Sequence, residues 1–138
     1  GVKADSIMPS AMQNDVNMEQ AKKSAECGAK YYIDVANMPT TNDALEFLKE
    51  QKHMVIAPSK AVNACGVAVS ALEMAQNAER LYWTAEEVDA KMHQIMANIY
   101  HSSVAAAERY GLGYDLVAGA NIVGFQRVAD AMMAQGIF

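Results

Sequence analysis

The chain is poor in the residues that build the more specialised classes of protein. Cysteine occurs only 2 times in 138 residues, as Cys27 and Cys65, which excludes a disulfide framework and indicates reduced thiols in the cytoplasm. No histidine or cysteine spacing fits a metal site, so no metal is expected. The net charge of −5 is spread along the chain, which argues against a surface for nucleic acid.

Long apolar runs and targeting signals are also missing. No apolar stretch reaches the roughly 18–20 residues that a helix needs to cross a bilayer, so we expect no membrane partner. No basic segment followed by an apolar one opens the chain, as a signal peptide would require. Residue 1 is glycine rather than methionine, and the first residues read as the middle of a domain. We therefore expect a piece of a longer protein.

What the sequence does contain is a layout that recurs along its first half. A short run of strand-type residues is followed by a proline, a hydroxyl residue and a helical pattern. Proline ends a strand because it has no N–H to donate, and the hydroxyl side chain can cap the next helix. The predicted strands are 4–8, 31–36 and 53–57, and the proline–hydroxyl pairs are Pro9–Ser10, Pro39–Thr40 and Pro58–Ser59.

Helices are predicted between and after these strands. Thr84 and Glu87 form the pattern of a capping box, which should open a long helix that ends near Gly111. Alternating strands and helices predict an α/β fold with a mostly parallel sheet, followed by helices only. The other predicted helices are 14–27, 41–50, 59–81 and 121–135. The apolar positions of the last helix, predicted to face inward, are Ile122, Phe125, Val128, Ala129 and Met132.

Polar side chains follow each predicted strand. In an open parallel sheet, ligands bind beyond the carboxyl ends of the strands, so these side chains should converge at one edge. Alternatively, each of them only satisfies nearby backbone groups in a turn. The residues concerned are Gln13, Asn14, Asn37, Lys60 and Asn63.

The helix predicted after Pro58 carries a second polar feature. Asn63, Val67 and Ser70 stand at i, i+4 and i+7 and so share one helical face. An amide and a hydroxyl on either side of an apolar wall could hold the two ends of a small polar molecule. The small residues at this helix start could equally provide clearance for packing on the sheet.

Several segments resemble the carboxy-terminal part of bacterial hexameric glutamate dehydrogenase, within the glutamate/leucine/phenylalanine/valine dehydrogenase superfamily. The similarity runs in order along essentially the whole chain. The matching segments are VANMPTT at 35–41, PSKAVNACGV at 58–67, SALEMAQN at 70–77, WTAEEVD at 83–89 and VAGANI at 117–122.

The resemblance implies reversible oxidation of L-glutamate to 2-oxoglutarate and ammonia, with hydride transfer to NAD or NADP, NAD being favoured. It implies a cytoplasmic homohexamer for the full-length protein. It also implies that residues 1–80 form the second half of a Rossmann-like NAD(P)-binding domain. Residues 81–138 would then be carboxy-terminal helices that pack back on that domain.

The resemblance also assigns roles to the polar residues. Asn63, Val67 and Ser70 would bind the substrate, with Ser70 on the side-chain carboxylate of glutamate. The cofactor-binding residues would be Gln13, Asn14, Asn37 and Asn63. The chain departs from the family at Cys65, where glycine is usual, and at Met12, where threonine is usual. Either change could affect binding.

In the family, the proton-transfer lysine and aspartate and the glycine-rich turn come from regions before this segment. No catalytic residue is therefore expected here, and we predict that the chain alone is inactive. Two alternatives remain open: a non-catalytic binding or association module, and a leucine, phenylalanine or valine dehydrogenase. Ser70 argues against an apolar substrate, which would leave its hydroxyl without a carboxylate partner.

Overall fold

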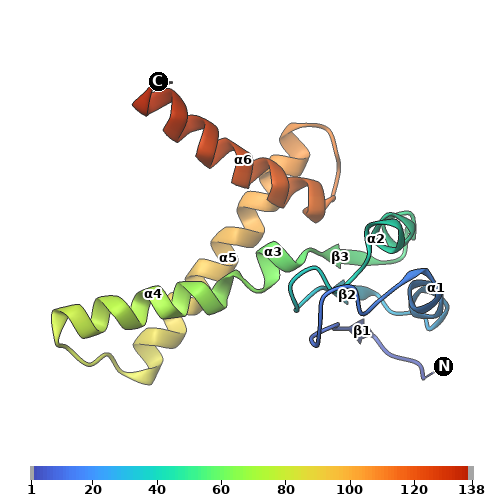
Figure 1. The fold of residues 1–138 in the computed structure, drawn as a ribbon, viewed down its shortest axis with the longest axis horizontal. Coiled ribbons are helices and arrows are strands. Elements are labelled where there is room, and N and C mark those ends of the chain that lie inside the picture. The colour runs from blue at the N-terminus through green and yellow to red at the C-terminus, as the bar shows by residue number, and fades with distance from the viewer. Residues whose placement is uncertain (1, 137–138) are drawn as a thin grey trace.

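The computed structural model describes residues 2–136. Strands and helices alternate up to the third strand, after which only helices follow (Figure 1). The bounds are β1 (Ser6–Ile7), α1 (Met18–Glu26), β2 (Tyr31–Ile33), α2 (Asn42–Lys49), β3 (Val55–Ala57), α3 (Ser59–Val62), α4 (Ala64–Glu79), α5 (Ala85–Arg109) and α6 (Leu116–Gln135). None of the helices in this described range is long and apolar enough to span a membrane.

The strands form one parallel sheet in the order β1-β2-β3. Tyr32 at the centre pairs with Ile7 on one side and Ile56 on the other. The predicted α/β class with a parallel sheet is confirmed. The strands are shorter than predicted because the chain turns away early: the N–H groups of Val35 and Ala36 both donate to the carbonyl of Pro9.

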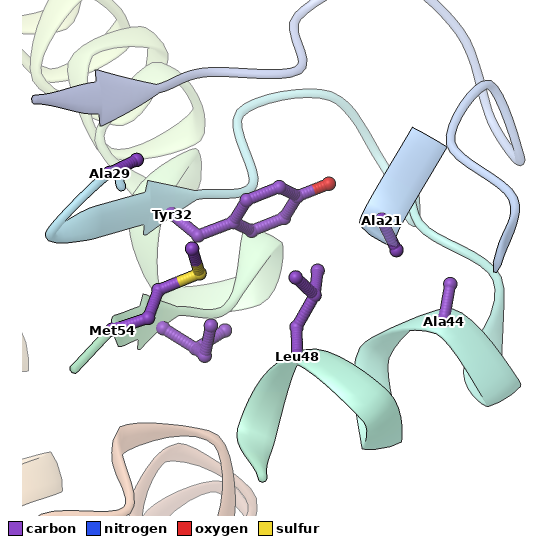
Figure 2. Close-up of a cluster of buried hydrophobic side chains, with 7 residues drawn as sticks. Ala21, Ala29, Tyr32, Ala44, Leu48 and Met54 are labelled. Atoms are coloured by element: carbon purple, nitrogen blue, oxygen red, sulfur yellow. The ribbon is translucent and has the colours of Figure 1, made fainter. Parts of the chain in front are cut away.

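The hydrophobic core lies between the sheet and the helices α1 and α2. Tyr32 and Leu48 are fully buried there, and Figure 2 shows both side chains between the central strand and the two helices. Small residues on the helices allow this close packing, because an alanine lets the neighbouring backbone approach. The remaining members of the core are Ala21, Ala29, Ala44, Met54 and Ile56.

The first helix begins later than predicted. Asn14 has a left-handed backbone (φ 58°), so a helix cannot pass through it. Instead its N–H donates to the carbonyl of Met38, and Val16 forms a parallel bridge with Thr40. The helix then starts at Met18, after a capping box made by Asn17 and Gln20. This correction has a non-local cause, since residues 14–16 extend the pairing of the sheet.

The hydroxyl residues after the prolines do not cap the helices, contrary to the prediction. Ser10 donates its hydroxyl to the carbonyl of Met8, and Thr40 donates to the carboxylate of Asp34. Ser59 lies inside α3, after Pro58 at the cap position. The predicted helix 59–81 is also divided, because the backbone at Asn63 departs from α-helical geometry between α3 and α4.

The carboxy-terminal helices extend beyond the β3 edge of the sheet (Figure 1). The capping box of Thr84 and Glu87 opens α5 as predicted. The last helix starts earlier than predicted, at Leu116, because the side chain of Asp115 accepts the N–H of Ala118 and caps it.

The expected inward face of α6 is wrong for part of its length. Phe125, Val128 and Met132 are all at least half exposed, whereas Ile122 and Ala129 are partly buried. The reason is visible in Figure 1, where the end of α6 extends away from the rest of the chain. Packing on α5 therefore covers only part of its apolar surface.

Candidate functional site

A polar hollow lies beyond the carboxyl ends of the strands. Its volume is about 650 Å³, and it is open to solvent. We call it the strand-end hollow, and it is lined by Ser10, Ala11, Gln13, Val35, Ala36, Asn37, Asn63 and Val67. These residues come from the segments after β1 and β2 and from the junction of α3 and α4, as expected for a parallel sheet.

Two of the amide side chains that line this hollow are hydrogen-bonded to each other. The Nδ2 group of Asn63 donates to Oδ1 of Asn37 at 2.8 Å and to the carbonyl of Val35 at 3.2 Å. Both hydrogens on that nitrogen are thus used, which leaves Oδ1 of Asn63 as an acceptor and Nδ2 of Asn37 as a donor. We call Asn37 and Asn63 the amide pair.

A buried hydroxyl chain connects residues that precede and follow Asn37 in the sequence. Thr40 donates to Oδ1 of Asp34 at 2.8 Å, so the 2.8 Å bond between Thr40 and Tyr32 must use the proton of Tyr32. All three residues are buried. Burial raises the pKa of Asp34, against the opposing effect of the Thr40 hydrogen bond, and burial raises the pKa of Tyr32 to about 12.

The sequence pattern does not indicate this hydroxyl chain. It predicts Thr40 as a helix cap and Asp34 as part of a strand. The available signal is an aspartate at the end of an apolar strand with a threonine six residues later. A carboxylate in such a place needs a donor, and a returning loop can bring one.

The structure brings some of the predicted site residues together and separates others. Gln13, Asn37, Asn63 and Val67 all line the strand-end hollow. Ser70 does not, and its hydroxyl donates to the carbonyl of Gly66 one turn back, at 3.3 Å.

Two further polar residues that follow the strands are not part of this lining. Asn14 is outside the lining, and its backbone serves the pairing with Met38. Lys60 also turns away from the hollow, because its ammonium group donates to the side chain of Asn121 on α6. Cys65 and Met12, the departures from the family pattern, are likewise not among the lining residues.

The lining determines what this hollow can do chemically. It offers amides, a hydroxyl and apolar walls, and none of its side chains titrates near neutral pH. Such a surface can bind and orient a polar molecule, but it has no general acid or base. Its volume lies within the range of about 300–1,000 Å³ that is typical of ligand sites.

Comparison with known proteins agrees with this fold. A family model described as glutamate/leucine/phenylalanine/valine dehydrogenase matches residues 1–136. NAD-specific glutamate dehydrogenase of Clostridium symbiosum is 71% identical over 99% of this chain and 30% of its own length. NADP-specific glutamate dehydrogenase of Psychrobacter sp. (strain TAD1) is 50% identical over 99% of this chain and 31% of its own length.

A solved structure of a glutamate dehydrogenase superposes with a TM-score of 0.95 and 71% identity, over 99% of this chain and 30% of that one. The chain thus spans about 30% of the length of the curated relatives it matches. Because the family match extends over almost the whole sequence, and a solved relative has the same fold, this chain belongs to the glutamate/leucine/phenylalanine/valine dehydrogenase family.

Proposed function

We propose that the chain is the carboxy-terminal part of a glutamate dehydrogenase that oxidises L-glutamate to 2-oxoglutarate and ammonia, with NAD favoured over NADP. The observation that carries this proposal is the amide pair at the strand ends, in a chain 71% identical to an NAD-specific glutamate dehydrogenase. Residues 1–80 would be the second half of the cofactor domain, and 81–138 the helices that return to it. The full-length protein would be a homohexamer.

The strand-end hollow suits the nicotinamide end of such a cofactor. The donor left on Asn37 and the acceptor left on Asn63 are complementary to a carboxamide, which carries one acceptor and one donor group. Gln13 lines the same hollow and can bind the ribose, while Asn14 would support the loop that carries Gln13. When bound, the nicotinamide would accept the hydride, and these side chains would bind and orient it.

The substrate would lie along the α4 face that begins at Asn63. Val67 would provide its apolar wall and is largely exposed, as a residue awaiting a partner surface would be. The hydroxyl of Ser70 would bind the side-chain carboxylate. To donate to that carboxylate it must leave the carbonyl of Gly66, which is inexpensive because that bond is long, at 3.3 Å.

The proton transfers of the reaction need groups that this lining does not contain. We therefore propose that the remainder of the full-length protein provides them and that the 138-residue chain alone has no dehydrogenase activity. Without a general base held near substrate, a bound amino acid would not react. This division of work also fits the open shape of the strand-end hollow, which a second domain would have to close.

The proposal is tested on the full-length protein with a spectrophotometric assay of NAD and NADP reduction. Glutamate is expected to support turnover with NAD preferred, and leucine, phenylalanine and valine to support far less. Leucine turnover above that of glutamate would instead assign one of the related dehydrogenases. Absence of turnover with all four amino acids would leave a non-catalytic binding module and overturn the proposal.

A further inference from the structure

The residues that form the amide pair do not hold themselves in place. Asn37 lies at the exposed tip of a loop, residues 34–40, in which Met38 has a left-handed backbone (φ 48°). A methionine in this conformation costs free energy, so it persists only where the surroundings enforce it. Contacts with neighbouring segments must therefore enforce the shape of this loop.

Backbone hydrogen bonds fix the loop from the side of β1. The carbonyl of Met38 accepts the N–H of Asn14 at 3.0 Å, and the carbonyl of Pro39 accepts the N–H of Val16 at 2.9 Å. These bonds anchor the returning half of the loop to its neighbour. They do not join the two ends of the loop to each other.

A single side-chain contact does join those ends. Asp34 begins the loop and Thr40 ends it, and the hydroxyl of Thr40 donates to the carboxylate of Asp34 at 2.8 Å. Both side chains are buried, so water cannot replace either partner if the bond is lost. The hydroxyl of Tyr32 donates to the same oxygen of Thr40 at 2.8 Å, which further restrains that side chain.

The closed loop in turn positions Asn63. That side chain donates to two points of the loop, the carbonyl of Val35 near its start and Oδ1 of Asn37 near its middle. If the loop opened, the spacing of these two acceptors would change, and Asn63 would lose at least one of them. The N–H groups of Val35 and Ala36, which donate to the carbonyl of Pro9, also hold the start of the loop. The bond between Thr40 and Asp34 adds the direct link between its two ends, so the orientation of both amides should respond to the loss of this bond.

We propose that Thr40 is a positioning residue for the amide pair, acting through its hydrogen bond to Asp34. Thr40 is not among the residues that line the strand-end hollow, so it acts indirectly, through the loop that carries Asn37. The inference deepens the proposed function, on which it rests for its kinetic readout. Its structural readout, the distance between the two amides, stands without that function.

The test compares three variants of the full-length protein. Thr40→Val keeps the shape and removes the donor, Thr40→Ser restores the hydroxyl, and Thr41→Val is the matched control. Thr41 is the next residue, and its hydroxyl makes no hydrogen bond to Asp34 or to the amide pair. A positioning role predicts at least about a 10-fold fall in kcat/KM for glutamate oxidation in Thr40→Val, since small misplacements are costly. Thr40→Ser and Thr41→Val should stay within about 3-fold of wild type.

A mutant cycle separates positioning from a loss of stability. In a background that carries both Asn37→Ala and Asn63→Ala, Thr40→Val should lower kcat/KM by less than about 2-fold further, because both side chains that it positions are gone. An undiminished second loss would show that Thr40 acts only through general stability, which overturns the inference. If Thr40→Val does not fold, Thr40→Cys takes its place, since a thiol is only a weak donor.

Crystal structures of the same variants decide the matter whatever reaction is catalysed. The 2.8 Å contact between Asn37 and Asn63 should persist in Thr40→Ser and Thr41→Val and be lost in Thr40→Val. An intact contact in Thr40→Val would overturn the inference. Absence of glutamate oxidation in the wild type would count against the proposed function alone, since the distance would still report on positioning.

Discussion

Gly119 of α6 lies against the backbone of α5 so closely that a methyl group on it would overlap the carbonyl oxygen of Ser103. Both residues are buried where the two helices cross. Only a residue without a side chain allows this crossing, because the obstacle is backbone and cannot rotate away. The close packing of α6 on α5 therefore requires a glycine at position 119.

The first prediction concerns this crossing. Gly119→Ala should force the helices apart and destabilise the protein by about 1–3 kcal/mol, the usual range for overpacking. Gly124→Ala is the control on the same helix, since a methyl group there would meet nothing within 4 Å. The control should be neutral or stabilising by up to about 1 kcal/mol, from helix propensity. Thermal unfolding of both variants measures the difference, and equal melting temperatures would contradict the close approach.

The second prediction concerns the polarity of the amide pair. Asn63→Asp would set a carboxylate oxygen against the carbonyl of Val35 and Oδ1 of Asn37, where the amide now donates to both. Repulsion should displace the side chain and lower kcat/KM of the full-length enzyme by at least about 100-fold. Asn77→Asp, on the exposed surface of α4, adds the same charge and should have little effect. A similar loss in both variants would indicate an effect of charge alone.

The third prediction separates substrate from cofactor. Ser70→Ala should raise KM for glutamate by roughly 10-fold or more, because a hydrogen bond to a charged group is lost, while KM for NAD stays the same. Ser24→Ala is the matched control, since that hydroxyl makes the same type of bond one turn back, to the carbonyl of Gln20. Initial-rate kinetics with each substrate varied in turn will measure both constants. An equal rise in the two KM values would argue against a role on the substrate carboxylate.

The fourth prediction follows from the buried carboxyl of Asp34, whose pKa is raised mainly by burial. The folded protein therefore holds this proton more tightly than the unfolded chain does. The stabilisation is complete below the ordinary pKa of 3.8 and is lost as the pH rises through the higher folded value.

Asp34→Asn does not titrate, so the stability of wild type relative to this variant should fall with rising pH across that interval and then level off. Denaturant unfolding from pH 3 to 7 measures the difference, in which the other carboxyl groups cancel. A difference that rises with pH would mean that Asp34 is stabilised as a charge.

The sequence was a good guide wherever the determinants are local. The strand-type runs before each proline correctly indicate a parallel sheet, and Thr84 with Glu87 correctly marks the start of α5. Asn37 and Asn63 are also brought to one hollow, because the ends of parallel strands must meet at one edge. These features depend on residue type and spacing within a few positions.

The features that were missed depend on contacts between distant segments. Asn14 was predicted to be helical, but its backbone serves a bridge to the next strand region. Ser70 shares a helical face with Asn63 and yet lies outside the strand-end hollow, because the lining comes mostly from the segments after β1 and β2 and includes only Val67 of α4. Its predicted role on the substrate stays a prediction.

The start of α6 could have been found. Asp115 stands directly before an apolar run, as a capping residue does, and it is also held by Lys49 of α2 at 3.4 Å.

The two bonds made by Nδ2 of Asn63 have one more consequence. A flip of the Asn63 amide would set its oxygen against the carbonyl of Val35 and Oδ1 of Asn37. The positions of the free donor and the free acceptor are therefore fixed before any ligand binds. An incoming carboxamide can satisfy both free groups in a single orientation of that group, which would fix the point at which an attached ring enters the hollow. A deamidated analogue, with a carboxylate in its place, would set one of its oxygens against Oδ1 of Asn63, so that two acceptors would meet without a hydrogen between them. The fold would in this way select for the carboxamide before the rest of the ligand makes contact.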